Sequence, residues 1–247
     1  MLIHPWDAAR DHDEWRSWLR TRDFGQIAAN GVDGAAPVVV PTHFLFDGAS
    51  EVVLHLARPN PIWAALEANP MAVVSVHDDY AYIPSGWRAD SPEAGVPTSY
   101  YASVQLVCRA EIVDDREGKA EILRRQLAHH QPAGDHGEVS AAAGPYHKML
   151  SAIRGLRLRV LDVRAKFKYD DHRPELRDRV AAGLTERALP GDAGALTQQR
   201  RRSTRPPPDP APAFGQARIT RHLPVCQLFQ PGLKQLVRTT VTVRLIA

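Results

Sequence analysis

The pattern of apolar and polar residues changes several times along the chain and predicts a mixture of short helices and short strands. Trp15, Trp18 and Leu19 repeat at helical spacing after Asp11, a favourable residue for capping a helix N-terminus. The next runs are short, rich in β-branched and aromatic residues, and separated by Gly-containing turns, which is typical of strands. The expected strands are Phe24–Ala29, Pro37–Phe46, Glu51–Ala57, Met71–His77, Tyr80–Ile83, Thr98–Val113 and Leu156–Val163.

Helical patterns return between these strands, and the two kinds of element together favour an α+β fold. Many short strands with a few helices are typical of a barrel or sandwich core, and a closed barrel leaves no exposed sheet edge. The expected helices are Pro61–Ala68, Asp114–His130, Pro145–Ile153 and one that starts at Pro174.

The distribution of charge divides the chain near residue 190. Residues 190–247 carry nine basic and two acidic residues, whereas residues 1–189 carry 22 basic and 26 acidic ones. The C-terminal part also holds eight of the 20 prolines, which weaken helix and sheet ladders. We therefore expect a folded domain over residues 1–190 and a disordered Pro/Arg-rich extension over residues 191–247.

The same charge distribution bears on nucleic acid as a partner. An acidic body argues against direct DNA binding by the folded domain. The extension has two interpretations: a basic arm that binds nucleic acid, or a disordered tail without that role, which we favour because its arginines are spread among Pro and Gln. Its last run, Val237–Ile246, has strand propensity but no obvious hairpin partner.

Other whole classes of protein are excluded by composition. No apolar run approaches the ~20 residues that cross a bilayer, and the N-terminus lacks the features of a secretory signal. Cys108 and Cys226 are too few for a disulfide framework or a Cys-rich zinc site, and we expect reduced thiols in a cytoplasmic protein. His129, His130 and His136 lack matching ligands at helical spacing, so no metal site is expected.

One segment has the composition of a phosphate site. A strand ends at Ala57, Asn60 is suited to cap the next helix, and Pro61 suits its first position. The amides of a first helical turn bind anions, and the Arg58 guanidinium can grip a phosphate with two hydrogen bonds. The alternative is that Arg58 pairs with a surface carboxylate and Asn60 only caps the helix.

Two further segments carry groups that suit a polar ligand. The segment from Pro97 to Gln105 is dense in hydroxyls, amides and aromatic rings, which could hydrogen-bond and stack on a heterocycle. In the expected link between strand and helix around Lys166–Pro174, Lys168 or Arg173 could face an anionic ligand. The alternatives are a polar outer face of a barrel strand and a solvated charged loop.

Together these segments resemble the PaiB-like FMN-binding negative transcriptional regulators, relatives of the pyridoxamine 5′-phosphate oxidases with the FMN-binding split β-barrel. The resemblance covers roughly residues 1–190. It rests on the segments His55–Trp63, Tyr82–Trp87, Val96–Thr98 and Lys166–Lys168, followed by Arg173-Pro174.

The resemblance implies a homodimer that holds FMN in a groove between subunits. Arg58 and Asn60 would lie at the FMN phosphate, and the strand that starts at Thr98 would lie near the isoalloxazine ring. No residue is recognisable as a catalytic acid or base. The cofactor-binding residues that we expect are Arg58, Asn60, Thr98, Ser99, Gln105 and Lys168.

The chain departs from the family pattern mainly among the residues expected near the isoalloxazine ring, which we call the ring end. Ser99-Tyr100 replace the usual Trp-Asn, Gln105 replaces a His, and Cys108 replaces a Gly. Tyr169–His172 also differ from the residues that usually precede Arg173. The phosphate end is kept, so we expect FMN binding with an altered environment for the ring.

The sequence leaves three functional hypotheses. The first is an FMN-binding protein of the negative transcriptional regulator family. The second is an FMN-dependent oxidoreductase of the pyridoxamine 5′-phosphate oxidase-like superfamily, in which the flavin carries the chemistry. The third is a related barrel that binds haem or another small molecule through the unassigned histidines.

Overall fold

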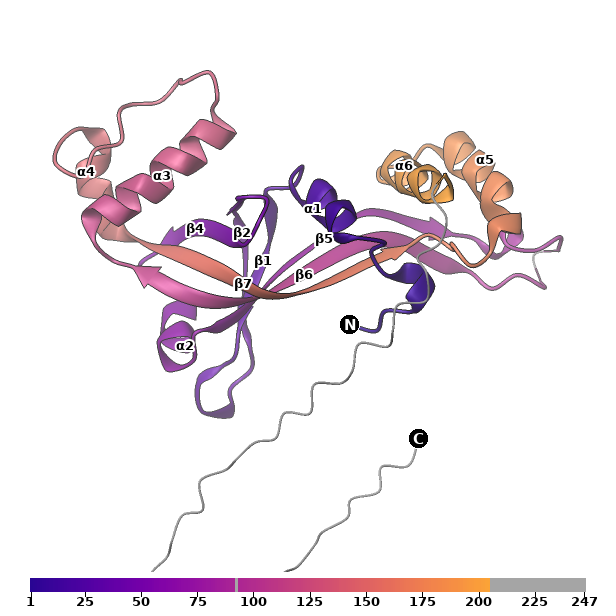
Figure 1. The fold of residues 1–247 in the computed structure, drawn as a ribbon, viewed down its shortest axis with the longest axis horizontal. Helices are drawn as coiled ribbons and strands as arrows, with labels where there is room; N and C mark the ends of the chain where they lie inside the picture. The colour runs from indigo at the N-terminus through magenta and orange to yellow at the C-terminus, as the bar shows by residue number, and fades with distance from the viewer. Residues whose placement is uncertain (92, 205–247) are drawn as a thin grey trace, which may run out of the picture. The chain divides into compact units, whose positions relative to one another are not determined.

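The computed structural model describes residues 1–91 and 93–204 (Figure 1). The expected strand Val237–Ile246 and the rest of residues 205–247 lie outside the described residues. The elements are α1 (His12–Leu19), β1 (Phe24–Ala29), β2 (Val38–His43), β3 (Leu45–Phe46), β4 (Glu51–Ala57), α2 (Ile62–Ala68), β5 (Met71–Ile83), β6 (Thr98–Val113), α3 (Arg116–His130), α4 (Pro145–Met149), β7 (Ile153–Lys168), α5 (Arg177–Arg187) and α6 (Asp192–Ser203).

The seven strands form one antiparallel sheet in the order β2-β1-β5-β6-β7-β4-β3. β6 and β7 are each 16 residues long, pair along most of their length, and run between the α3–α4 end and the α5–α6 end (Figure 1). Although β2 and β4 are not hydrogen-bonded neighbours, they lie against each other. The sheet therefore curls into a barrel that is split between β2 and β4, which confirms the α+β prediction.

The barrel interior is filled by every second residue of the central strands. Leu54 of β4, Val104 and Leu106 of β6, and Leu156 of β7 are fully buried in one core cluster. Because successive side chains of a strand point to opposite faces, the odd-numbered residues of β6 from Tyr101 to Val107 lie on the outer face. This outer face carries most of the ring-end residues expected from the sequence.

Two strands are longer than the sequence pattern predicted. The two expected strands around Asp79 form the single strand β5, which is irregular at this residue because its φ is 54°. β7 was expected to end at Val163 but continues to Lys168, because Ala165 and Phe167 still face the core. Lys166 and Lys168 therefore belong to a strand and not to the expected link.

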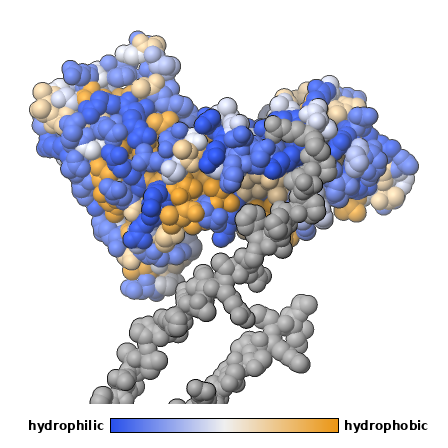
Figure 2. Space-filling view, in the orientation of Figure 1, coloured by the Kyte–Doolittle hydropathy of each residue, from blue (hydrophilic) through white to orange (hydrophobic). Residues whose placement is uncertain are grey.

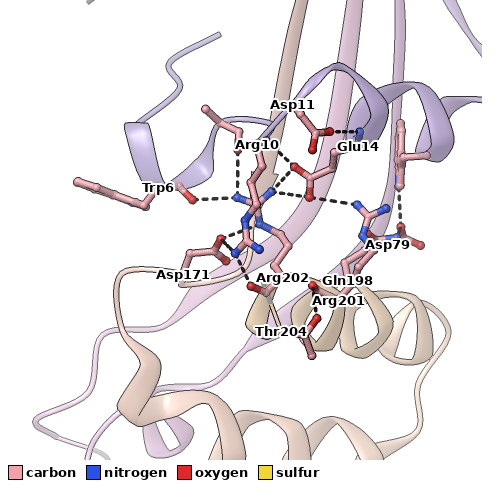
Figure 3. A network of polar contacts seen from close by, with 12 residues as sticks. Trp6, Arg10, Asp11, Glu14, Asp79, Asp171, Gln198, Arg201, Arg202 and Thr204 are labelled. Carbon is pink, nitrogen blue, oxygen red and sulfur yellow. Dashed lines mark hydrogen bonds and ion pairs between the residues drawn. The ribbon is translucent and has the colours of Figure 1, made fainter. Parts of the chain in front are cut away.

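The folded unit extends beyond the boundary expected near residue 190. Helix α6 packs on β5 and α5, although its residues were assigned to the extension. Arg202, near its end, is 1% exposed and bonds to Glu14 and Asp171 of the body (Figure 3). The average composition of residues 191–247 did not predict this helix. It counts Arg202 as a solvated charge, although Arg202 is buried against two carboxylates.

Within the part of the chain that the structure describes, every helix is too short or too polar to cross a membrane.

Candidate functional site

Arg58 lies directly after β4, where this strand pairs with the start of β7. Its backbone N–H donates to the carbonyl oxygen of Ala152 at 2.8 Å. Its guanidinium donates from Nε to the Ser151 carbonyl oxygen at 2.8 Å and from Nη2 to Asp114 Oδ1 at 3.0 Å. The side chain is still 45% exposed, so the guanidinium is held in place and remains accessible to an anion.

Asn60 caps helix α2 as the sequence predicted. Its Oδ1 accepts a hydrogen bond from the Ile62 N–H at 3.1 Å. The Ile62 N–H, which the expected phosphate site would have used to bind a ligand, therefore already donates to Asn60. In addition, α2 has only seven residues. Arg58 is therefore the strongest anion-binding group of this segment.

The charges around Arg58 are nearly balanced. Asp114 also accepts a hydrogen bond from Arg154 Nη2 at 2.7 Å, and Arg154 Nη1 reaches Glu67 at 2.6 Å. Arg154, with a smaller effect of Arg58, holds the pKa of the Asp114 carboxyl below its ordinary value. Because Asp114 keeps Arg154 as a partner, Arg58 can turn to a ligand without leaving a carboxylate unpaired.

The expected ring-end residues lie along β6 and the end of β7. Lys168 Nζ donates to Thr98 Oγ1 at 2.7 Å, while Ser99 and Gln105 are half-buried. The antiparallel register places Tyr101 opposite Lys168 and Gln105 opposite Arg164. Residues directly opposite each other share a face, so these side chains belong to one polar surface outside the barrel.

This surface includes three cations at every second position of β7, Arg164, Lys166 and Lys168, which we call the β7 cation row. Lys166 is 7% exposed, donates to the Leu2 carbonyl oxygen at 2.9 Å and lies 3.6 Å from Asp7 Oδ2. Burial raises the pKa of the Asp7 carboxyl, and Lys166 opposes this shift. The N-terminal segment therefore covers the middle of the row.

Lys168 differs from Lys166 because it keeps spare hydrogen-bonding capacity. Its ammonium has three donors and gives one to Thr98. Among the described residues no carboxylate lies within ion-pair distance of it. Burial lowers the pKa of the Lys168 ammonium, and the neighbouring Lys166 lowers it further. A half-buried cation of this kind gains most from an acceptor on a ligand.

The structure does not bring all the expected cofactor-binding residues together in one chain. Ala57, next to Arg58, pairs with Ile153 at the start of β7, whereas Lys168 ends the same strand (Figure 1). At ~3.3 Å per residue, roughly 50 Å of strand lies between these two points. Arg58 and Asn60 thus form one group, and Thr98, Ser99 and Lys168 form another, with Gln105 between them.

Arg164 and Lys166 also belong to this surface, although neither was an expected cofactor-binding residue. Tyr101 belongs to it as one of the aromatic rings expected in the segment from Pro97 to Gln105. The signal was available in the alternation of Arg164, Lys166 and Lys168, which has the period of a strand. The density of charges there is also typical of a solvated loop, which is why the sequence favoured a link at this point.

Comparison with protein families gives one match to this region. The model of a family described as "Putative FMN-binding domain" matches residues 1–162. The match includes Arg58 and the whole of β6, and it ends before Lys168. A comparison with curated protein sequences found no match.

Solved structures with a similar fold include two with flavin in their names. The flavocytochrome Anf3 from Azotobacter vinelandii is 23% identical, with 66% of this chain and 70% of that chain covered at a TM-score of 0.52. The FAD and haem binding protein from Mycobacterium smegmatis is 21% identical, with 66% and 73% covered at a TM-score of 0.51. At these identities the likeness establishes the fold.

Proposed function

Since the chain belongs to the family of FMN-binding domains whose model matches residues 1–162, we propose that it is an FMN-dependent redox protein of the pyridoxamine 5′-phosphate oxidase-like superfamily. The family match carries this proposal. The names of the two structural neighbours, a flavocytochrome and an FAD and haem binding protein, also support a flavin. We choose FMN over FAD because of the family description.

The outer face of β6 and β7 fits the ring of a flavin. An isoalloxazine ring has a flat π-face and one edge rich in hydrogen-bond acceptors. Tyr101 offers an aromatic ring, and Gln105 and Lys168 offer amide and ammonium donors on the same face. FMN would supply the hydride or electron chemistry. Lys168 would stabilise the negative charge that develops on the ring edge during reduction.

Arg58 would bind the FMN phosphate from a second copy of the chain. The roughly 50 Å of strand between Arg58 and Lys168 exceeds the length of FMN, so a single chain does not offer both groups to one flavin. Two copies related by a two-fold axis would pair the phosphate end of one with the ring end of the other.

The surface also supports this homodimer. Leu161 of β7 is 48% exposed, and Figure 2 shows apolar surface gathered near the middle of the long strands. A second copy of the chain that covers exposed apolar surface of this kind would exclude water from it. FMN would then be enclosed by both subunits.

The absorption spectrum of the purified full chain tests the proposal. We expect oxidised flavin bands and release of FMN, identified by mass spectrometry, after heat denaturation. Bleaching of these bands by a nicotinamide cofactor without air would support an oxidoreductase. Absence of binding after incubation with excess FMN, or a Soret band in place of flavin bands, would overturn the proposal.

Negative transcriptional regulation, which the sequence resemblance implies, stays a prediction. It requires DNA as a partner, and residues 205–247, the basic part of the extension, lie outside the described residues. Retention of the full chain on operator-length DNA at low salt, with loss of retention after deletion of residues 205–247, would support that role.

A further inference from the structure

Four histidines gather at the gap where the barrel is split between β2 and β4. His43 ends β2, His55 lies in β4, and His129 and His130 form the last turn of α3. The ring centroids of His43 lie 5.4 Å from His55 and 5.3 Å from His130, and those of His129 and His130 are 4.8 Å apart. Residues distant in the sequence thus form one cluster.

A carboxylate joins two of these imidazoles. Asp23 stands before β1, and its carbonyl oxygen accepts the Phe44 N–H at 2.7 Å, which fixes Asp23 beside the end of β2. Asp23 Oδ2 lies 3.4 Å from His129 Nε2 and 3.4 Å from His130 Nδ1. One ligand atom from each of Asp23, His129 and His130 lies within 4.8 Å of the other two.

The two separations from Asp23 Oδ2 suit atoms that share a metal ion. With Zn–N and Zn–O bonds of ~2.0–2.1 Å, neighbouring ligand atoms of a tetrahedral site are about 3.3 Å apart. Both distances from Asp23 Oδ2 are 3.4 Å. A direct charge-assisted hydrogen bond would be shorter, about 2.7–2.9 Å. The geometry is therefore closer to that of a coordination shell than to that of ion pairs.

A cavity lies beside the cluster, and one residue of its lining has a buried polar atom without a partner. Asp23, His43, His55, Gln126 and His130 are among the residues that line this cavity of about 420 Å³. Gln126 is 2% exposed, and its Oε1 lies 2.6 Å from His55 Nδ1. Its buried Nε2 has no hydrogen-bond partner among the described residues.

We propose that Asp23, His129 and His130 bind a divalent transition-metal ion that favours imidazole ligands, with Zn²⁺ as the representative ion. Two imidazoles and one carboxylate are a donor set that binds such ions and leaves a coordination position open. His43 and the cavity border this open position. The ion ties the end of α3 to Asp23, the residue that precedes β1.

This proposal reverses the expectation of no metal site, which rested on sequence spacing alone. His129, His130 and His136 lie close together in the sequence, but the third ligand, Asp23, lies more than 100 positions before His129. The site shares no residue with the proposed flavin surface, so each can fail without the other.

The test is calorimetric titration of the metal-free full chain with Zn²⁺, together with Co²⁺ as a spectroscopic probe. We expect one ion per chain, visible d–d bands of low-symmetry four-coordinate Co²⁺, and a higher Tm with Zn²⁺ than with a chelator. His130→Ala should weaken Zn²⁺ binding by at least about 100-fold. Loss of a residue that only hydrogen-bonds to a metal ligand weakens metal affinity by at most about that factor. His136→Ala is the matched control and should bind Zn²⁺ like the wild type.

Three results would overturn the proposal. They are absence of saturable binding of one Zn²⁺ per chain, equal affinity of the wild type and His130→Ala, and equal weakening by His130→Ala and His136→Ala. Far-ultraviolet circular dichroism checks that each variant is folded. If His130→Ala does not fold, the Co²⁺ spectrum of the wild type decides, because bands of octahedral aqueous Co²⁺ alone would contradict the site.

Discussion

Arg202 and the β7 cation row lie on the same domain, but the protein satisfies their charges to very different degrees. Arg202 Nη1 donates to both carboxylate oxygens of Glu14 at 2.8 Å, and its Nε donates to Asp171 Oδ2 at 2.8 Å (Figure 3). Its Nη2 reaches the carbonyl oxygens of Trp6 and Ala8, both at 3.1 Å. All of its nitrogens are thus occupied by the chain itself.

Lys168 and Arg164, at the two ends of the cation row, show the opposite arrangement, whereas Lys166 between them is buried and paired. Lys168 gives one of three donors to Thr98, and Arg164 is 54% exposed, with Asp162 at 3.6 Å as its ion-pair partner. A buried charge with every donor satisfied holds the fold together, whereas a cation with spare donors on a strand face is available to a ligand. The difference separates structural charges from binding charges.

The largest expected effect is on the stability of the domain. Arg202→Met should lower the free energy of unfolding by roughly 3–5 kcal/mol, because it removes a fully buried cation from two buried carboxylates. Asp171 then keeps Arg10 as its charged partner, and Glu14 keeps Arg201. Urea denaturation measures this loss. Arg200→Met, on the exposed side of the same helix, is the control and should change stability by less than about 0.5 kcal/mol. Similar changes in the free energy of unfolding for both variants would contradict the structural role of Arg202.

The corresponding change in the cation row should affect binding and leave the fold nearly unchanged. Lys168→Met should weaken FMN binding by about 1.5–3 kcal/mol, the range for hydrogen bonds to a charged group. A fluorescence titration measures the affinity, with Arg200→Met again as the control. Full FMN affinity in Lys168→Met would show that the isoalloxazine ring does not bind at this surface.

A pH-dependent effect is expected where α5 meets α6. Asp192 is 2% exposed and accepts two hydrogen bonds from Arg187, which holds the pKa of its carboxyl below the ordinary value. Its stabilising effect is therefore complete above the unfolded-state pKa near 4 and is lost as pH falls through the lower folded-state pKa.

Asp192→Asn should thus lower stability by about 1.5 kcal/mol at pH 7, and its difference from the wild type should shrink below about pH 4. Urea denaturation at several pH values measures this difference. Asp178→Asn, at an exposed position of α5, should show no such pH dependence. A constant difference between Asp192→Asn and the wild type at all pH values would contradict the linkage.

The smallest expected effect is at a neutral side chain of the same outer face. Gln105→Leu should weaken FMN binding by roughly 0.5–1.5 kcal/mol, because it removes a neutral hydrogen-bond donor and keeps the size of the side chain. The same fluorescence titration measures it. An effect equal to that of Lys168→Met would show that charge is not what distinguishes Lys168.

The sequence predicted best those elements whose apolar pattern is local. The bounds of β1, β4 and β6 are the predicted ones, because each run alternates or is continuously apolar and ends at a turn residue or a capped helix. β7 and α6 were misjudged because Lys166 and Arg202 are charged residues buried by distant partners. Such partners leave no trace in a local pattern.

The candidate site could be predicted only where its residues lie close together in the sequence. Arg58 and Asn60 came from a contiguous motif, and the structure confirms that Asn60 caps α2. The roughly 50 Å of strand between Arg58 and Lys168 follows only from the pairing of β4, β6 and β7. The cluster of Asp23 with His43 and His130 likewise depends on how the barrel closes.

The central claim is that one flavin is bound by Arg58 of one copy and Lys168 of the other. Arg58→Ala and Lys168→Met, each weak in FMN binding alone, should be mixed in equal amounts after unfolding and refolded together. Random pairing makes hybrid dimers with one intact site each, so about a quarter of the wild-type FMN sites should return. FMN binding that stays at the level of the separate variants, in dimers shown to be mixed, would contradict the claim.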